Sequence, residues 1–263
     1  MKINKAVIAI AGKGSRMAPI TSAIPKEMLP IGTTPILQMI IDEVISSGID
    51  EILFVISTDR QIVTEYLCGV RKPEDYNAYE KTYSYSLDKS VKIRFVYQKK
   101  PLGTANAVSL AKKFADGEPF ALLYGDDLFV GDKPALKELI ELSEAKNGAS
   151  VIGVQHINRL EASNYATVVS HDFDGKKGRI QTIIEKQRAE DISSDLTSVG
   201  RYVLSSDVFE FVDKVPVHNK ETWITDAIND LAENEDVYAC LIESVRHDTG
   251  SPEGYIHAFK TLC

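Results

Sequence analysis

Two glycines and two basic residues near the N-terminus have the types and spacing of a phosphate-binding loop. They lie within residues 11–32, AGKGSRMAPITSAIPKEMLPIG. Gly12 and Gly14 let backbone N–H groups approach a large anion closely. The Arg16 guanidinium can fork onto phosphate oxygens, and the Lys26 ammonium adds a compact second charge. Two cations beside open amides predict a polyphosphate site, and specifically a triphosphate site.

Two commoner glycine motifs do not fit this loop. A dinucleotide fingerprint requires a third glycine or alanine where Met17 stands. A Walker A loop requires Gly-Lys-Ser/Thr after a four-residue gap, whereas Lys13 lies between the two glycines. Pro25 and Pro30 stiffen the segment that carries the second cation. The loop therefore belongs to a different class of phosphate site.

Acidic residues follow a buried strand later in the chain. Residues 120–124, FALLY, are apolar and deliver Gly125, Asp126 and Asp127 at the carboxyl end of the expected strand. This end of a strand faces the ligand crevice in open α/β sheets, and Mg²⁺ prefers carboxylate and phosphate oxygens. Asp126 is thus a candidate metal ligand. A simple β-turn is the alternative interpretation of Gly-Asp-Asp.

Two further strand ends carry polar groups. At the end of the strand expected over 91–98, Gln98 has the donor and acceptor needed to pair with uracil or thymine. Gly103 then opens a helix near Thr104. A helix-opening turn alone would explain the same pattern. A strand pair over 165–169 and 179–186 ends in Glu185 and Lys186, where a carboxylate can accept sugar hydroxyls and an ammonium can neutralise a phosphate. An exposed ion pair is the alternative there.

Alternating elements position these groups. Apolar runs at 5–11 and 51–57 predict buried strands, and helical spacing at 35–45 and 60–68 predicts the helices that follow them. This order favours a doubly wound, right-handed parallel sheet. Further helices are expected over 133–146 and 221–231, with strands over 149–155 and 198–204, and 221–231 is interpreted as scaffold. Residues 70–90, rich in tyrosine and charge, are expected to leave the main sheet as an insertion.

Composition limits the class of protein. The net charge of −8 argues against a nucleic-acid or anionic-membrane surface. Cys68, Cys240 and Cys263 are too widely spaced to indicate a disulfide framework or a zinc site. No apolar run is long enough to span a bilayer, and the N-terminus lacks a signal-peptide pattern. We therefore expect a cytoplasmic protein without nucleic-acid or membrane partners.

Residues 12–30 resemble the signature of the sugar-1-phosphate nucleotidylyltransferases, G-x-G-T/S-R-x-x-P-x-T-x-x-x-P-K-x-x-x-P. The stretch AIPKEMLP is most similar to the bacterial UTP-glucose-1-phosphate uridylyltransferases among them. The signature is met at Gly12, Gly14, Ser15, Arg16, Pro19, Thr21, Pro25, Lys26 and Pro30. The resemblance continues through Glu185-Lys186, the strand VGRYVL and His247-Asp248-Thr249-Gly250.

The resemblance implies an active site and a reaction. The fold would be α/β, a Rossmann-like doubly wound mixed sheet, mostly parallel, with a smaller sugar-binding β subregion, in one domain over 1–263. Its halves would be 1–130, which binds nucleotide, and 131–263, which binds sugar phosphate. UTP and a sugar 1-phosphate would react by in-line attack on the α-phosphorus and release pyrophosphate, in a homodimer or homotetramer. The implied roles are catalysis by Arg16, Lys26 and Lys186; nucleotide binding by Ala11, Gly12, Gly14, Gln98 and Gly103; sugar binding by Gly125, Ala166, Glu185 and Lys186; and Mg²⁺ binding by Asp126 and Asp248.

Several positions depart from the family pattern. Ala166 replaces a glycine, Gln187 replaces a proline after Glu185-Lys186, and SPEGY at 251–255 replaces a lysine-containing stretch. These changes leave the identity of the sugar, and the choice between UTP and dTTP, open. A weakly active relative that binds a nucleotide sugar and regulates a partner is the alternative to an enzyme.

Overall fold

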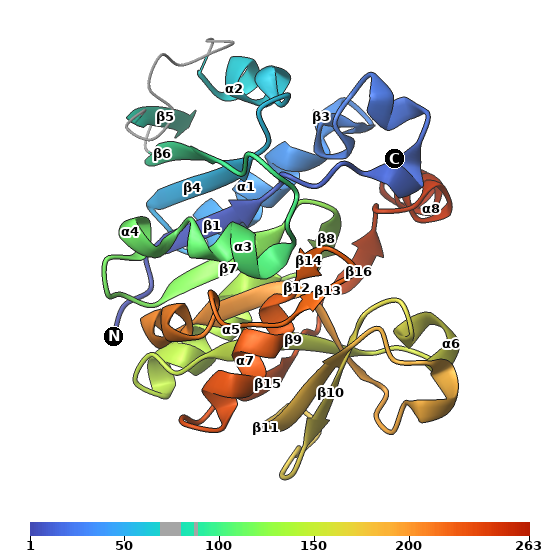
Figure 1. The fold of residues 1–263 in the computed structure, drawn as a ribbon. Helices are drawn as coiled ribbons and strands as arrows, with labels where there is room; N and C mark the ends of the chain where they lie inside the picture. Colours follow the sequence, from blue (N-terminus) through green and yellow to red (C-terminus); the bar gives the residue numbers. More distant parts are fainter. Residues whose placement is uncertain (69–79, 87–88) are drawn as a thin grey trace. The chain divides into compact units, whose positions relative to one another are not determined.

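The computed structural model describes residues 1–68, 80–86 and 89–263. The described chain forms two compact units (Figure 1). The glycine-loop unit comprises Asn4–Pro101, Leu123–Pro134 and Ser244–Cys263, and the hairpin unit comprises Met1–Ile3, Leu102–Leu122 and Ala135–Glu243. The chain crosses between the units more than once, and the expected nucleotide-binding and sugar-binding halves remain a prediction.

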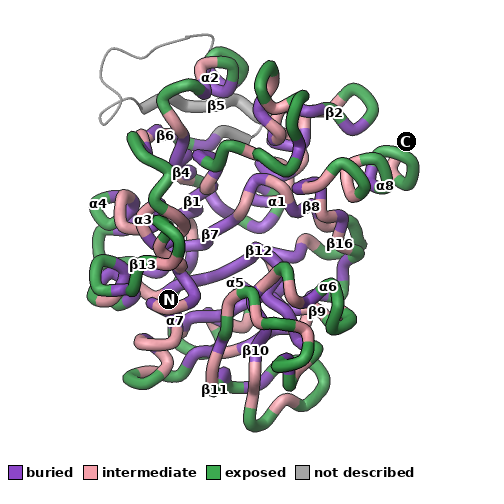
Figure 2. The backbone as a smooth tube through the Cα atoms, turned by 45° about the vertical axis from the view of Figure 1, so that its right-hand side comes forward, coloured by how far each residue is buried: buried purple, intermediate pink, exposed green. Residues whose placement is uncertain are grey.

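The glycine-loop unit is built on parallel strands. β1 (Lys5–Ala9) pairs in parallel with β4 (Glu51–Ile56), which pairs in parallel with β6 (Lys89–Tyr97). All residues of β1 except Ala9 and all residues of β4 except Glu51 are buried, and Figure 2 colours the backbone by this burial. The strands expected over 5–11, 51–57 and 91–98 are therefore confirmed, because continuous apolar runs of this length suit a sheet covered on both faces.

Residues 80–86 are not an excursion from this sheet. They form β5 (Glu80–Ser86), which pairs antiparallel with β6 at the edge of the unit's sheet. The expectation for this part of the insertion is wrong, because pairing with β6 satisfies the backbone groups that a surface arm would expose to water. Residues 69–79 and 87–88 of the expected insertion, and the side chains of its tyrosines, lie outside the described residues.

Helices and short elements complete the glycine-loop unit. α1 (Ile36–Ser46) follows Pro35, and Gly48 with φ 96° lies just past its end, as the sequence predicts. The helices α2 (Gln61–Cys68) and α8 (Pro252–Leu262) follow later in the chain. An antiparallel ribbon joins β8 (Asp127–Val130) to β16 (Val245–Asp248), and it places Asp127 opposite Asp248. The short elements are η1 (Ser15–Met17), η2 (Ile20–Ser22), η3 (Lys26–Met28), β2 (Pro30–Ile31) and β3 (Thr34–Pro35).

The hairpin unit is mainly antiparallel. Its central strand β9 (Val151–His156) pairs in parallel with β15 (Tyr238–Leu241) and antiparallel with the fully buried β12 (Leu196–Leu204). The predicted strand pair is present as β10 (Ala166–Ser170) and β11 (Lys177–Glu185), joined through residues 171–176. A short turn between neighbouring strands forces antiparallel pairing, so the expectation of a mostly parallel sheet does not extend to this unit.

Helices pack against the sheet of the hairpin unit. α5 (Ala135–Ala145) contacts β9, β12 and β15, while α7 (Ile224–Ala232) contacts β11 and α3 (Thr104–Ser109). The smaller elements are α4 (Lys112–Ala115), α6 (Arg159–Ala162), η4 (Ala189–Asp191), η5 (Ser206–Glu210), β13 (Val217–His218) and β14 (Glu221–Thr222). β7 (Phe120–Tyr124) spans a boundary between the units in the sequence. The mixed α/β class is thus confirmed.

The described residues contain no helix that is both long enough and apolar enough to span a bilayer.

Candidate active site

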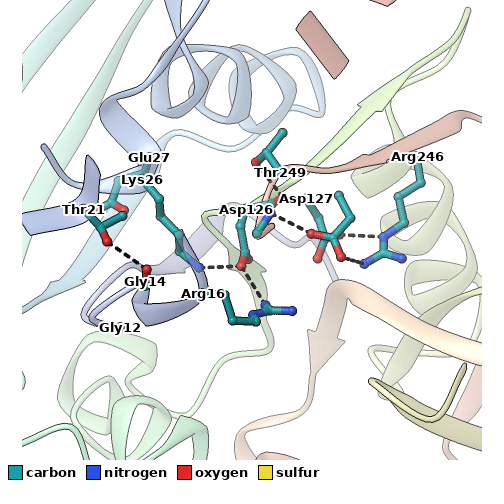
Figure 3. Close-up of polar contacts among 12 residues, drawn as sticks. Gly12, Gly14, Arg16, Thr21, Lys26, Glu27, Asp126, Asp127, Arg246 and Thr249 are labelled. Atoms are coloured by element: carbon teal, nitrogen blue, oxygen red, sulfur yellow. Dashed lines mark hydrogen bonds and ion pairs between the residues drawn. The ribbon is translucent and has the colours of Figure 1, made fainter. Parts of the chain in front are cut away.

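The two glycines of the loop, Gly12 and Gly14 (Figure 3), differ in backbone conformation and in the space around them. Gly14 has φ 65°, and its carbonyl accepts a 2.9 Å hydrogen bond from the Thr21 hydroxyl. A Cβ at Gly14 would lie 3.0 Å from Thr21 Cγ2. Gly12 is different, because a Cβ there would meet nothing within 4 Å. The backbone therefore requires glycine at 14, whereas the space at Gly12 is available to a ligand.

Two predicted cations converge on one predicted carboxylate. The Lys26 ammonium donates to Asp126 Oδ2, and Arg16 Nη2 lies 3.9 Å from the same oxygen (Figure 3). Thr249 donates to the backbone carbonyl of Asp126 through both its amide, at 2.7 Å, and its hydroxyl, at 2.8 Å. These contacts hold the turn between β7 and β8 in place and direct the Asp126 carboxylate toward the glycine loop.

The ion pair shifts the pKa of both partners. Burial alone would raise the pKa of Asp126, but attraction to Lys26 and Arg16 outweighs it and holds that pKa below its usual value. Burial would likewise lower the pKa of Lys26, yet attraction to Asp126 raises it. Both groups are therefore charged at neutral pH. Arg16 is 61% exposed and can reach a bound anion without losing much buried contact.

Asp126 and Asp248 border the same small space. A Cβ at Gly250 would lie 2.8 Å from Asp126 Oδ2, 3.0 Å from Asp248 Oδ1 and 2.9 Å from Arg16 Nη2. The Gly250 amide donates to Asp248 Oδ1 at 2.7 Å. The missing side chain at 250 thus keeps room between two carboxylates. Two carboxylates suit Mg²⁺, which commonly completes its shell with water and phosphate oxygens.

The described residues contain no group of three or more His, Cys, Asp or Glu side chains that could hold a metal by themselves.

A largely buried arginine, Arg246, which no sequence motif singled out, pairs with Asp127 and Asp248. Arg246 Nε contacts Asp127 Oδ1 at 2.5 Å, and its Nη2 lies 3.5 Å from Asp248 Oδ2. Asp127, which follows the candidate metal ligand Asp126 in the chain, therefore pairs with Arg246 (Figure 3). Arg246 and Asp248 alternate on β16 and so share a face, which is the sequence signal that could have identified Arg246.

A second buried pair contacts the glycine loop itself. Arg60 donates through Nη2 to the Gly12 carbonyl, and its Nε lies 3.4 Å from Glu27 Oε1. Glu27 immediately follows Lys26, and burial raises its pKa despite the nearby Arg60 charge. Neither residue type indicated a role in the sequence, where Glu27 lies within AIPKEMLP and Arg60 begins the helix predicted over 60–68.

The predicted base-binding residues fall in both units. Gln98 is buried just after β6, and its backbone N–H donates to the Ile56 carbonyl at 2.9 Å. Ala11 is buried just after β1. Gly103 belongs to the hairpin unit and has φ 100°, and a Cβ there would overlap the Thr222 carbonyl oxygen. Close packing against Thr222 therefore explains the glycine at 103, and its role toward the base stays a prediction.

The predicted sugar-binding residues are also divided between the two units. Gly125 lies in the glycine-loop unit, where a Cβ would overlap Ile10 Cγ2. Ala166, Glu185 and Lys186 lie together in the hairpin unit, where Ala166 pairs with Glu185 across the hairpin. The Lys186 amide donates to the Tyr165 carbonyl at 2.9 Å, and Lys186 itself has φ 49°. This turn places Glu185 and Lys186 at the end of β11.

Glu185 and Lys186 also contact a hydroxyl group and an aromatic ring in the hairpin unit. The Thr225 hydroxyl lies 3.4 Å from Glu185 Oε2, and burial is the main reason that the pKa of Glu185 is raised. Lys186 Nζ lies 5.6 Å from the centroid of the Trp223 ring. Trp223 in turn stacks on His218, with the ring centroids 3.9 Å apart.

The stack that contacts Lys186 has an anchor in α7. His218 Nε2 lies 3.0 Å from Asp226 Oδ2. Residues 221–231 therefore do more than form scaffold, because Trp223 and Asp226 link this segment to Lys186. A lone tryptophan beside a predicted helix start gave no sequence signal for this contact.

Gln187, which departs from the family pattern, makes a side-chain hydrogen bond within the β10–β11 hairpin. The Thr167 hydroxyl donates to Gln187 Oε1 at 2.5 Å, and Thr167 is buried on β10. This bond ties the residue after Lys186 to the opposite strand. The substitution for proline thus replaces one constraint on the Lys186 turn with another.

Comparison with known proteins agrees with this geometry. A family model described as nucleotidyl transferase matches residues 5–263. The UTP–glucose-1-phosphate uridylyltransferase 1 of Staphylococcus saprophyticus is 34% identical, over 97% of this chain and 91% of that protein. The UTP–glucose-1-phosphate uridylyltransferase YngB of Bacillus subtilis is 33% identical, over 98% of this chain and 88% of that protein.

Solved structures show the same fold. A UDP-glucose pyrophosphorylase complexed with UDP-glucose has a TM-score of 0.87 and 28% identity, covering 98% of each chain. A UTP-bound UGPase from Acinetobacter baumannii has a TM-score of 0.82 and 25% identity, covering 98% of this chain and 93% of the other. The signature of residues 12–30 predicted this relationship, and the chain belongs to the nucleotidyl transferase family.

Proposed function

We propose that this chain joins UTP to glucose 1-phosphate and forms UDP-glucose and pyrophosphate. One observation carries the proposal: Arg16 and Lys26, from the glycine loop, converge on the strand-end carboxylate of Asp126. Opposite charges gathered beside open backbone suit a triphosphate and a divalent cation. The names of the similar proteins, uridylyltransferases acting on UTP and glucose 1-phosphate, support this choice of substrates.

The glycine-loop unit would bind the triphosphate. Gly12 and Gly14 would offer backbone amides, while Arg16 and Lys26 would neutralise phosphate oxygens. Asp126 and Asp248 would hold Mg²⁺, which when bound supplies positive charge to the phosphate oxygens. Lys26 pairs with Asp126 in the structure, so it would exchange this partner for a phosphate when the nucleotide and metal bind.

The remaining roles concern the base and the sugar. Gln98 would pair with the uracil edge, supported by Ala11 and Gly103. Glu185 would accept hydrogen bonds from sugar hydroxyls, with Gly125 and Ala166 leaving room for the ring. Lys186 would neutralise the phosphate of the sugar.

The chemistry needs no covalent enzyme intermediate. An oxygen of the sugar phosphate attacks the α-phosphorus in line, a new P–O bond forms, and the bond to the β-phosphate oxygen breaks to release pyrophosphate. Both reactants are anions, so alignment and charge neutralisation are the main tasks of the protein. Arg16, Lys26 and Lys186 would carry out this neutralisation.

The test is pyrophosphate release from the purified chain, with UTP or dTTP against a panel of sugar 1-phosphates, with and without Mg²⁺. We expect UTP, glucose 1-phosphate and Mg²⁺ to give the highest kcat/KM. A higher value with dTTP or with another sugar would reassign the substrate and keep the reaction. Absence of release with every pair would refute the enzyme and favour a regulatory binder of nucleotide sugars.

Two other properties remain predictions. We expect a homodimer or homotetramer, which light scattering after size exclusion measures directly. We also expect a cytoplasmic location, without nucleic-acid or membrane partners, in keeping with the net charge of −8.

A further inference from the structure

Arg60 and Glu27 form a buried charge pair in which Arg60 also contacts the Gly12 carbonyl. Arg60 is 5% exposed and Glu27 is fully buried. Neither Glu27 carboxylate oxygen has a hydrogen-bond donor within the described part of the chain. A buried ion pair is costly to desolvate, and an apolar pair of similar size is often at least as stable. Packing alone therefore does not account for these two charges.

Arg60 fixes the orientation of one peptide bond. Its Nη2 donates to the Gly12 carbonyl oxygen. In a trans peptide the carbonyl of one residue and the N–H of the next point in opposite directions. With the Gly12 carbonyl directed to Arg60, the Lys13 amide must face away from Arg60.

The opposite orientation would harm phosphate binding. Glycine at 12 has no side chain to restrain its peptide, and the space around it is open. If the peptide rotated by half a turn, a carbonyl oxygen would replace the Lys13 N–H on the side that faces away from Arg60. That oxygen would repel an anion, whereas the N–H attracts it.

We propose that Arg60 is a positioning residue that holds the Gly12–Lys13 peptide with its N–H toward the triphosphate, and that Glu27 keeps Arg60 in place. This inference rests on the proposed function. Glu27 neutralises the guanidinium and holds it away from the phosphates. Because Glu27 adjoins Lys26, one short segment would supply both the Lys26 contact to phosphate and the carboxylate that keeps Arg60 in place.

The experiment measures UTP binding by calorimetry with no sugar present, for the wild type, Arg60→Met, Arg60→Lys and the double variant Arg60→Met/Glu27→Gln. We expect the Kd for UTP to rise at least tenfold in each variant. Lysine carries its three N–H donors on one nitrogen, so it does not reproduce the fixed fork by which Arg60 uses Nη2 for the Gly12 carbonyl and Nε for Glu27. The matched control is Arg94→Met, which removes a half-exposed arginine paired with Glu51 at 3.3 Å in the same unit.

The double variant separates positioning from folding. Arg60→Met leaves a buried carboxylate unpaired and can fail to fold, whereas the double variant removes both charges. If the double variant regains the wild-type Kd, the loss in Arg60→Met came from the unpaired charge and the inference is overturned. Equal Kd values for wild type and Arg60→Met would also overturn it.

A second measurement does not depend on affinity. The ¹⁵N–¹H signal of the Lys13 amide should move on UTP addition in the wild type and move less in the double variant. An unchanged response would contradict the inference and leave the proposed function intact. Failure of the wild type to bind UTP would overturn both.

Discussion

The two units support their candidate residues in different ways. In the glycine-loop unit, charges contact charges: Lys26 and Arg16 meet Asp126, and Arg246 lies between Asp127 and Asp248. In the hairpin unit, Glu185 contacts a threonine hydroxyl and Lys186 lies near an indole ring. The candidate residues of the glycine-loop unit are held mainly by ion pairs, whereas those of the hairpin unit, Glu185 and Lys186, also rely on a hydrogen bond and on aromatic packing.

Under the proposed function, this difference separates neutralisation of the triphosphate, which every sugar requires, from recognition of the sugar, which varies. Neutralising a triphosphate is needed for any sugar, and every charge predicted for that task is present in the glycine-loop unit. Two of the departures from the family pattern, Ala166 and Gln187, lie in the hairpin unit, whereas the third, residues 251–255, lies in the glycine-loop unit. Neutral and aromatic contacts can change without leaving a buried charge unpaired, so under the proposed function the residues around Lys186 would adapt to another sugar at a lower cost in stability.

The largest effect is expected from Lys26→Ala. Loss of one charge-stabilising contact typically costs about 3 kcal/mol of transition-state stabilisation, so the rate should fall about 100-fold or more. Pyrophosphate release at saturating substrate measures this. The control is Lys92→Ala, an exposed lysine of the same unit. A near-normal rate for Lys26→Ala would show that the charges of the glycine-loop unit are not needed for the reaction.

A smaller effect should distinguish the two loop glycines. Gly12→Ala places a methyl in the space proposed for phosphate but meets no protein atom, so the KM for UTP should rise about tenfold with an unchanged Tm. Gly14→Ala should instead cost about 1 kcal/mol of stability, because φ 65° is strained for alanine. Steady-state kinetics and thermal unfolding measure both. An altered Tm in Gly12→Ala would mean that the backbone, and not the ligand, requires that glycine.

Trp223→Ala tests the hairpin unit alone. A cation–π contact at a partly exposed site contributes about 0.5–1 kcal/mol, so the KM for the sugar phosphate should rise about threefold to fivefold. The calorimetric Kd for UTP should not change. Trp223→Phe keeps an aromatic face and should recover much of the loss. Equal effects on both substrates would contradict the division of labour between the units.

The smallest effects concern the pH dependence of stability, and they have opposite signs in the two units. The pKa of Asp126 is depressed, so its stabilising contribution is present above the ordinary value of 3.8 and is lost as the pH falls through the lowered pKa. Asp126→Asn should therefore destabilise the fold at pH 7 and flatten this acid dependence.

Glu185 should behave in the opposite way. Its pKa is raised by burial, so stability declines as the pH rises from the ordinary value of 4.5 through the raised pKa. Glu185→Gln should remove this decline and stabilise the fold at pH 7. Urea unfolding from pH 3 to 8 measures both variants. Parallel behaviour of the two variants would show that burial acts alike on the two carboxylates.

Much of this protein follows from local sequence. Continuous apolar runs predicted β1, β4 and β7, and the turn DFDGKKG predicted the β10–β11 hairpin. The signature of residues 12–30 predicted the family that the comparisons confirm. These features succeed because strand burial, turn formation and loop chemistry depend on residues that are close in the chain.

Long-range contacts could not be predicted in the same way. Arg60, Glu27, Arg246 and Trp223 gain their roles from segments far away in the chain, and their residue types alone suit many surfaces. The antiparallel edge strand β5 was missed for the same reason, because pairing depends on an available neighbour. The sequence by itself determined which charges and glycines the loop carries. Only the tertiary structure decided which partner each one meets, because a charge pair requires two segments to be packed against each other in space.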